Sequence, residues 1–310
     1  MKNKKISIVV PVYNEVNSID EFISEVDNLN INYELIFSCD PSNDGTEEKL
    51  KEYSKNSNGN VKTLILSRRF GQHPAIFAGL EYATGDAVIV MDIDGQDPVN
   101  IIPQMIEKWN YGFDVVYGKR VSRFGETFLK KIISGIGLRI ISKFSKINIP
   151  QDVGEFRLMD RKVVDIVNSF NEANPFLRGV VTYVGFKQTN VDFERPKRQA
   201  GETKYSKFSG SISFGLKGLT SFSNSLLYAS TYFGIFTSLL GFVLGIFYAY
   251  FKISGIVDFP IGNPTIVILI LFMGGIQLFS IGILGLYVGQ IFDQVKNRPL
   301  YIVDKIYGEN

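Results

Sequence analysis

The chain has few of the residues that build disulfides, zinc sites or histidine-based catalytic pairs. Its 310 residues include one cysteine, one histidine and one tryptophan. A single cysteine, Cys39, permits no disulfide within the chain and supplies no zinc cluster. An excess of charge is also lacking, because 33 lysines and arginines face 31 acidic residues and the formal net charge is +2. This balance argues against a nucleic-acid-binding protein.

Two common nucleotide-binding motifs are missing as well. The sequence contains neither G-x-G-x-x-G nor G-x-x-x-x-G-K-[ST], so neither a dinucleotide fingerprint nor a Walker loop is present. The opening residues, MKNKKISIVV, are basic, but the apolar stretch soon reaches Pro11 and Asn14 and is too short for a signal-peptide core. We therefore expect the N-terminal domain to lie in the cytoplasm.

Two long stretches, residues 218–251 and 259–292, carry no charge at all. Each exceeds the roughly 20 apolar residues that cross a hydrocarbon core. We predict a transmembrane hairpin over residues 226–292, with spans at about 226–251 and 265–290. A catalytic domain (1–204) and an interfacial segment (205–225) precede it, and a cytoplasmic tail (293–310) follows.

Basic residues flank the outer ends of this hairpin, namely Lys204, Lys207, Lys217, Lys296, Arg298 and Lys305. The positive-inside rule then places both termini at the cytoplasmic face of the cell membrane. Residues 127–149 mix lysine and arginine with isoleucine. That mixture is typical either of a helix at an anionic membrane surface or of a surface helix packed on its own domain.

The first half of the chain alternates short β-branched runs with helix-compatible stretches. We expect strands at residues 6–10, 35–38, 63–66, 87–91 and 114–117. Such alternation predicts an α/β fold with a mostly parallel sheet covered by helices. Ligands of these sheets bind beyond the C-terminal strand ends, where polar segments stand at residues 11–15, 40–46 and 92–98.

The strongest local signal is the D-x-D formed by Asp92 and Asp94, directly after a buried strand. Two carboxylates there repel each other unless a cation lies between them. Mg²⁺ or Mn²⁺, held by one or two carboxylates and by substrate phosphates, suits this spacing. An isolated D-x-D is more often a solvated acidic turn, but the position at a strand end favours the metal.

Three other features remain open from the residues alone. Glu155 and Arg157 come just before the apolar Leu158 and Met159, and form either a structural ion pair or part of a reacting centre. The basic residues 195–204 either anchor the chain to anionic lipid or bind a lipid phosphate. His73 stands where a helix begins and is more typical of a cap or packing residue than of acid–base catalysis.

In combination, several motifs resemble those of the polyprenyl-phosphate glycosyltransferases, a group that includes bactoprenol glucosyltransferases and dolichyl-phosphate mannose synthases. The motifs lie at residues 10–15 (VPVYNE), 40 and 44–46 (D and DGT), 67–71 (SRRFG), 92–98 (DIDGQDP), 153–159 (VGEFRLM), 200–205 (AGETKY), 218–223 (GLTSFS) and 295–301 (VKNRPLY). The resemblance covers nearly the whole chain. The two-span hairpin favours the bactoprenol branch.

The resemblance implies a nucleotide-binding α/β fold of the inverting, A-type kind. It implies transfer of a sugar from a nucleotide sugar, with UDP-glucose favoured, to undecaprenyl phosphate at the membrane, by a homotetramer. By position, the nucleotide sugar would meet Pro11, Tyr13, Glu15, Asp40, Asp92, Gln96 and Asp97, and the metal would meet Asp92 and Asp94. Catalysis would use Asp94, Glu155 and Arg157, while Arg198 and Lys204 would bind the lipid phosphate.

The chain departs from the usual family pattern around the expected donor. Residues 39–42 (CDPS) replace D-D-G-S, and Arg69, Gln72, Gly95 and Glu155 replace Asn, Lys, Leu and Asp. The donor sugar is therefore open, with an N-acetylhexosamine, mannose or a modified arabinose as alternatives. A processive polysaccharide synthase is disfavoured because no Q-x-x-R-W surrounds Trp109. A catalytically silent membrane sensor of sugar nucleotides is the alternative from another class.

Overall fold

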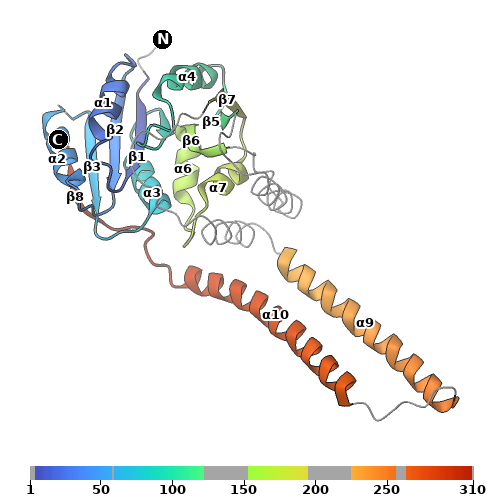
Figure 1. The fold of residues 1–310 in the computed structure, drawn as a ribbon. Helices are drawn as coiled ribbons and strands as arrows, with labels where there is room; N and C mark the ends of the chain where they lie inside the picture. The colour runs from blue at the N-terminus through green and yellow to red at the C-terminus, as the bar shows by residue number, and fades with distance from the viewer. Residues whose placement is uncertain (1–3, 58, 122–152, 195–224, 256–262, 309–310) are drawn as a thin grey trace.

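The computed structural model describes residues 4–57, 59–121, 153–194, 225–255 and 263–308. The strands are β1 (Ile6–Val12), β2 (Tyr33–Cys39), β3 (Val61–Leu66), β4 (Ala87–Val90), β5 (Val115–Arg120), β6 (Val153–Asp160), β7 (Gln188–Phe193) and β8 (Val303–Tyr307). The helices are α1 (Ile19–Asp27), α2 (Thr46–Asn56), α3 (Gln72–Tyr82), a short 3₁₀ turn (Val99–Ile101), α4 (Ile102–Asn110), α6 (Arg161–Ser169), α7 (Leu177–Val184), α9 (Ser225–Ile253) and α10 (Asn263–Val295). Figure 1 shows their arrangement.

The described strands form one mixed sheet in the order β7-β5-β6-β4-β1-β2-β3-β8. Strands β4, β1, β2 and β3 run parallel to one another, which confirms the predicted parallel arrangement in this part of the sheet. Strand β6 lies antiparallel between β4 and β5, and β8 lies antiparallel at the edge beside β3. The five strands predicted from apolar runs are confirmed, whereas β6, β7 and β8 were not predicted.

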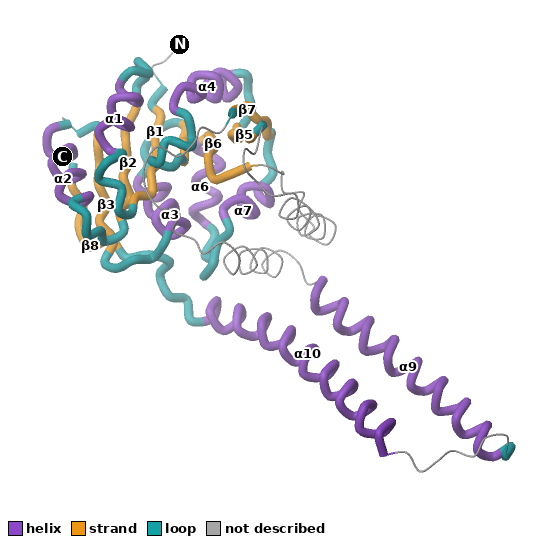
Figure 2. Tube along the Cα trace, in the orientation of Figure 1, coloured by secondary structure: helices purple, strands orange, loops and turns teal. Residues whose placement is uncertain are grey.

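Helices cover both faces of this sheet, as Figure 2 shows by colouring helices and strands differently. Side chains alternate along a strand, so Ile8 and Val10 of β1 face one core and Val9 faces the other. The first core includes side chains of α1, α2 and α4, and the second includes side chains of α3, α6 and α7. Because the central strands are buried on both faces, they read in the sequence as continuous apolar runs.

Helices α9 and α10 extend together away from the sheet (Figure 1). Their apolar windows, Leu227–Phe247 and Leu269–Val295, are long enough to cross a membrane by length and composition. Both predicted spans, residues 226–251 and 265–290, fall within these helices. Residues 127–149, predicted as a surface helix of the membrane or of the domain, lie outside the described residues, as does the predicted interfacial segment 205–225 except for its last residue, where α9 begins.

The segment that follows α10 returns to the sheet. Ser67 donates its backbone N–H to the carbonyl oxygen of Ile302 over 2.9 Å, and β8 then pairs with β3. Leu300 and Tyr301 pack against the core that includes α3. The region predicted as a cytoplasmic tail, residues 293–310, therefore contributes a strand to the sheet of the N-terminal domain.

Gly308 offers a test of how firmly this last strand belongs to the domain. It has a φ of +81°, and a Cβ there would collide with the carbonyl oxygen of Val61. Gly112 has a φ of +95°, but a Cβ there would meet nothing within 4 Å. Both substitutions to alanine carry the left-handed backbone cost of about 1–2 kcal/mol. We expect Gly308→Ala to lower the unfolding temperature further than Gly112→Ala.

The fluorescence of Trp109 measures this directly, because the only tryptophan is buried in α4. An equal loss of stability in the two variants would show that the close approach of residue 308 to Val61 does not help to hold β8 on the domain.

Candidate active site

The predicted donor-binding residues meet at one edge of the sheet because β1, β2 and β4 are parallel. Val12 lies opposite Cys39 in the register, and the N–H of Asp40 donates to the carbonyl oxygen of Val12 over 3.0 Å. Tyr13, Asp40 and Asp92 each follow the end of one of these strands. The structure thus brings together the strand ends that the sequence identified as a ligand site.

Asp40 is buried and holds the loop that follows β3. Its Oδ1 and Oδ2 accept the backbone N–H groups of Phe70 and Gly71, each over 2.9 Å. The same loop carries Arg69, whose guanidinium lies 4.0 Å from the centroid of the Tyr13 ring. Asp40 therefore positions a cation beside the end of β1.

The two remaining residues predicted near β1 have local partners. Pro11 lies in β1 opposite Ser38 of β2. The N–H of Glu15 donates to Oγ1 of Thr46, and Oε2 of Glu15 accepts the hydroxyl of Ser18. Glu15 is 9% exposed, so it stabilises the approach to α1 as well as lying near the edge.

The D-x-D forms a tight turn directly after β4. The N–H of Asp92 donates to Oδ2 of Asp97 over 3.1 Å, and the N–H of Gln96 donates to Oδ1 of Asp94 over 3.1 Å. Gly95, with a φ of +72°, allows the chain to reverse between them. Nε2 of Gln72, at the start of α3, donates to Oδ1 of Asp92 over 2.7 Å.

Negative charge accumulates at this turn. Desolvation, together with the carboxylates of Asp97, Asp94 and Glu155, raises the pKa of Asp92 above its ordinary value, and the hydrogen bond from Gln72 offsets only part of that rise. An added cation would reverse the effect, because it stabilises the charged form. The donor set of hard carboxylate oxygens suits Mg²⁺ or Mn²⁺.

The protein alone offers few ligands for such an ion. Among the described residues, no group of three or more His, Cys, Asp or Glu side chains has the geometry to hold a metal. Asp92 and Asp94 would therefore share the ion with oxygens of a bound diphosphate, which is how Mg²⁺ is commonly held. Asp92 and Asp94 therefore fit a divalent cation that also binds oxygens of the substrate.

Glu155 of β6 forms a buried cluster next to this turn. It is 8% exposed, and its Oε1 accepts from Nε of Arg178 over 2.7 Å and lies 3.6 Å from Nε2 of His73. Nη2 of Arg157 lies 3.5 Å from Oε2. The ring of Phe176 contacts the ring of His73 edge-on, with centroids 6.4 Å apart. The predicted ion pair between Glu155 and Arg157 is present, but Arg178 makes the shorter contact.

Arg157 has a different part in the cluster. It is 3% exposed and donates from Nη2 to the carbonyl oxygen of Gly154 and from Nε to that of Glu155. Its guanidinium therefore holds the backbone of β6 as well as contributing charge. Burial lowers the pKa of Arg157 to about 10, so it remains a cation at neutral pH.

The cluster keeps Glu155 ionised. Burial opposes its charge, but the nearby imidazole of His73 and the charges of Arg157 and Arg178 outweigh burial and hold the pKa of Glu155 well below its usual range. A carboxylate with such a low pKa is a weak base. The geometry therefore suits Glu155 to hold charge and orientation at this edge, with proton abstraction as the less favoured role.

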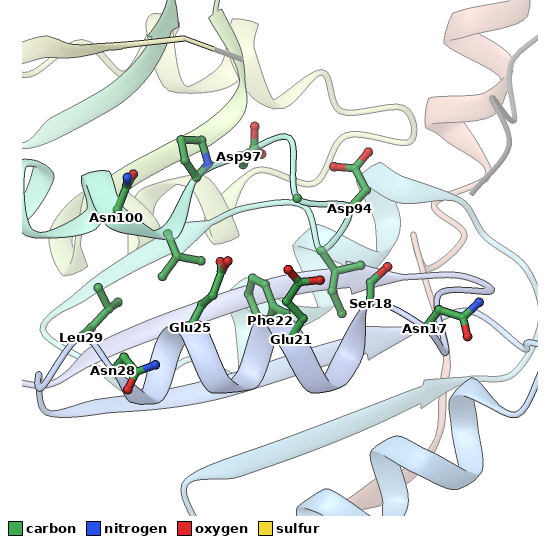
Figure 3. Close-up of a pocket in the computed structure, with 14 residues that line it drawn as sticks. Asn17, Ser18, Glu21, Phe22, Glu25, Asn28, Leu29, Asp94, Asp97 and Asn100 are labelled. Carbon is green, nitrogen blue, oxygen red and sulfur yellow. The ribbon is translucent and has the colours of Figure 1, made fainter. Parts of the chain in front are cut away.

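A cavity of about 450 Å³ opens on the other side of the D-x-D turn, between α1 and residues 93–100. Figure 3 shows acidic side chains from both walls: Glu21 and Glu25 from α1, and Asp94 and Asp97 from the turn. No lysine or arginine is among the described residues that line it. By charge alone this cavity suits a hydrated cation better than a diphosphate.

Sequence reasoning missed two residues of this site. Arg178 lies 23 residues after Glu155 along the chain and sits in an apolar helix, so no spacing connects them. Gln72 was noted only as a departure from a usual lysine, and its bond to Asp92 depends on where α3 begins. Arg198 and Lys204, predicted to bind lipid phosphate, lie outside the described residues.

Comparison with known proteins identifies the family. Residues 7–167 match glycosyl transferase family 2. The chain belongs to this family. It is 45% identical over 307 residues to YkcC, described as an uncharacterized glycosyltransferase of Bacillus subtilis, with 97% of this chain and 94% of that protein covered. It is 39% identical over 312 residues to the SfII prophage-derived bactoprenol glucosyl transferase of Shigella flexneri, with 99% of each covered.

A solved structure supports the fold of this glycosyltransferase. Glucosyl-3-phosphoglycerate synthase of Mycobacterium tuberculosis, in complex with Mn²⁺, UDP-glucose and phosphoglyceric acid, superposes with a TM-score of 0.50 at 16% identity. The match covers 70% of this chain and 78% of that one. The mixed α/β sheet is therefore of the A-type glycosyltransferase kind.

The charge on Glu155 predicts a pH-dependent cost for losing Arg178. Because the folded state lowers the pKa of Glu155, the cluster stabilises the protein above the unfolded pKa of about 4.3, and this contribution is lost as pH falls through the folded value. Arg178→Gln should therefore destabilise the protein by about 2 kcal/mol at neutral pH and by progressively less below about pH 4.5.

Thermal unfolding of wild type and variant across pH, followed by Trp109 fluorescence, checks this. Arg178→Lys keeps the charge and serves as the matched control. A destabilisation that stays constant with pH would mean that Arg178 acts through packing rather than through the charge of Glu155.

Proposed function

We propose that this glycosyltransferase moves a sugar from a nucleotide sugar onto a polyprenyl phosphate at the cytoplasmic face of a membrane. We favour UDP-glucose as the donor and undecaprenyl phosphate as the acceptor. The observation that carries the proposal is the carboxylate-rich edge of the sheet in a chain with two membrane-length helices. Relatives described as bactoprenol glucosyl transferases, matched over 99% of the chain, support the lipid acceptor.

The donor would lie across the ends of β1, β2 and β4. Asp92 and Asp94 would hold Mg²⁺ or Mn²⁺, which neutralises the charge of the departing diphosphate when bound. Tyr13, Asp40, Gln96 and the other predicted contacts would orient the nucleotide. The guanidinium of Arg69, which lies over the Tyr13 ring, would add a positive charge near the end of β1.

The acceptor needs little help to become a nucleophile. A phosphate monoester has a second pKa near 6 and is largely dianionic at neutral pH. Catalysis then depends on positioning and on charge neutralisation rather than on a strong general base. The clamped carboxylate of Glu155 fits such a role beside the reacting centre, with inversion at the sugar. Arg198 and Lys204 would contact the lipid phosphate.

The assembly and orientation also belong to this proposal. Both termini and the catalytic domain would be cytoplasmic, and α9 and α10 would cross the membrane. The protein would work as a homo-oligomer, a tetramer by family resemblance. A Cβ at Gly241, Gly245, Gly285 or Gly289 would meet nothing within 4 Å, so these faces of α9 and α10 leave space for a close helix contact.

Two alternatives remain. The first keeps the reaction and changes the donor sugar to an N-acetylhexosamine, mannose or a modified arabinose, because Arg69, Gln72 and Gly95 depart from the usual pattern around the donor. The second is a membrane sensor that binds sugar nucleotides without transfer.

Sugar transfer to radiolabelled undecaprenyl phosphate tests the proposal, using purified full-length protein in detergent and a panel of UDP- and GDP-sugars. We expect transfer of one sugar that requires Mg²⁺ or Mn²⁺ and falls by at least about 100-fold in Asp94→Asn. Asp165→Asn makes the same chemical change at an exposed carboxylate of α6 and should leave transfer intact.

Nucleotide binding without transfer from any donor would contradict the proposed enzyme and support the sensor. Transfer of a single sugar other than glucose would correct the donor and leave the reaction class standing.

A further inference from the structure

The C-terminal end of α10 is docked on the loop between α6 and α7. Oε1 of Gln294 accepts the backbone N–H of Ala173 over 2.9 Å, and Nε2 of Gln294 donates to the carbonyl oxygen of Asn171. Nδ2 of Asn171 in turn donates to Oδ1 of Asn297 over 2.6 Å. A glutamine at the end of an apolar helix thus satisfies a donor and an acceptor of one loop.

The helix end is also held from its other side. Asn297 adopts a left-handed conformation, with a φ of +47°, and turns the chain toward the sheet. The backbone bond from Ser67 to Ile302 and the pairing of β8 with β3 then fix the segment at the sheet edge. The end of α10 is therefore fastened between the α6–α7 loop and the sheet.

The same loop leads within a few residues to the buried carboxylate. Phe176 packs against His73, and the guanidinium of Arg178 lies 5.4 Å from the centroid of the Phe176 ring. Nε of Arg178 contacts Oε1 of Glu155 over 2.7 Å, and its Nη1 donates to the carbonyl oxygen of Val153. From Ala173 to Arg178 the chain passes from the end of α10 to the buried Glu155.

We propose that Gln294 and Asn171 are positioning residues that set where Glu155 and the donor edge stand relative to the membrane helix. This role rests on the proposed function, because it concerns an acceptor whose phosphate is confined to the membrane surface. Misplacement of reacting groups by about 1 Å can cost on the order of 100-fold in rate. A soluble acceptor diffuses to the site, whereas a membrane-anchored one depends on how the site is held above the bilayer.

The rival interpretation is that these hydrogen bonds only stabilise the C-terminal segment. The two interpretations predict different losses of activity with the two kinds of acceptor. A positioning role affects the membrane-anchored acceptor selectively, and a purely structural role lowers activity equally with any acceptor.

The experiment compares Gln294→Ala, Asn171→Ala and the double variant with wild type. Asp293→Ala is the matched control, because Asp293 is the preceding residue of α10 and is exposed. Each full-length protein is assayed with UDP-glucose, or with the donor that the panel identifies. The acceptor is either undecaprenyl phosphate in phosphatidylglycerol vesicles or water-soluble geranyl phosphate.

We expect kcat/KM for undecaprenyl phosphate to fall by about threefold to tenfold in each single variant, the range that corresponds to losing one or two hydrogen bonds. The value for geranyl phosphate should stay unchanged, and so should both values for Asp293→Ala. The double variant should lose less than the product of the single losses, because both residues belong to one contact.

Equal losses with both acceptors would overturn the positioning role in favour of a structural one, and no loss with either would show that the docking is not used. Wild-type protein that transfers sugar to neither acceptor would refute the proposed function itself, and this role with it.

Discussion

Repulsion among carboxylates at one edge of the sheet governs the charges of the site, because Asp94, Asp97 and Glu155 all act on the buried Asp92. The protein neutralises only part of this charge. Glu155 receives Arg178, Arg157 and His73, whereas Asp92 receives the neutral amide of Gln72. The pKa shifts follow this division, since that of Glu155 is lowered and that of Asp92 is raised. The negative charge of Glu155 is therefore neutralised by cations of the protein itself, whereas the Asp92 side of the edge is suited to an added cation.

The fold creates this division through one antiparallel strand. β6 enters the sheet beside β4 and runs against it, with Val90 opposite Arg157, so that its first residues extend past the end of β4 toward Asp92. The loop after α6 leads into α7, where Arg178 contacts Glu155. The same loop contacts the end of α10. A single run of the chain, residues 153–178, thus connects the sheet edge, its balancing cations and the helix proposed to lie in the membrane.

Much of the fold followed from the sequence because its elements are apolar in simple patterns. The central strands are buried on both faces, and α9 and α10 carry long, predominantly apolar windows. Strand β6 was not predicted because Glu155 and Arg157 interrupt its apolar pattern, and these residues read as a functional motif. Strands β7 and β8 are partly polar edge elements, QTNVDF and VDKIY, whose pairing depends on distant parts of the chain.

The site residues that could be predicted from the sequence are those that follow a recognisable strand. Asp92 and Asp94 were found because they follow a recognisable strand, and the structure places them where the parallel sheet requires. The partners of Glu155 were found only in part, since Arg157 is two residues away and Arg178 lies on another helix. Contacts between residues that are far apart in the chain have no characteristic spacing in the sequence.

The division of charge is tested most directly by calorimetric titration of Mn²⁺ and UDP into the full-length protein. We expect weak binding of either alone and much tighter binding of each in the presence of the other, because the ion would complete its ligands with diphosphate oxygens. Asp94→Asn should abolish this coupling, and Glu155→Gln should preserve it. Binding of UDP that is independent of Mn²⁺ and unaffected by Asp94→Asn would show that the carboxylates and the diphosphate do not share an ion.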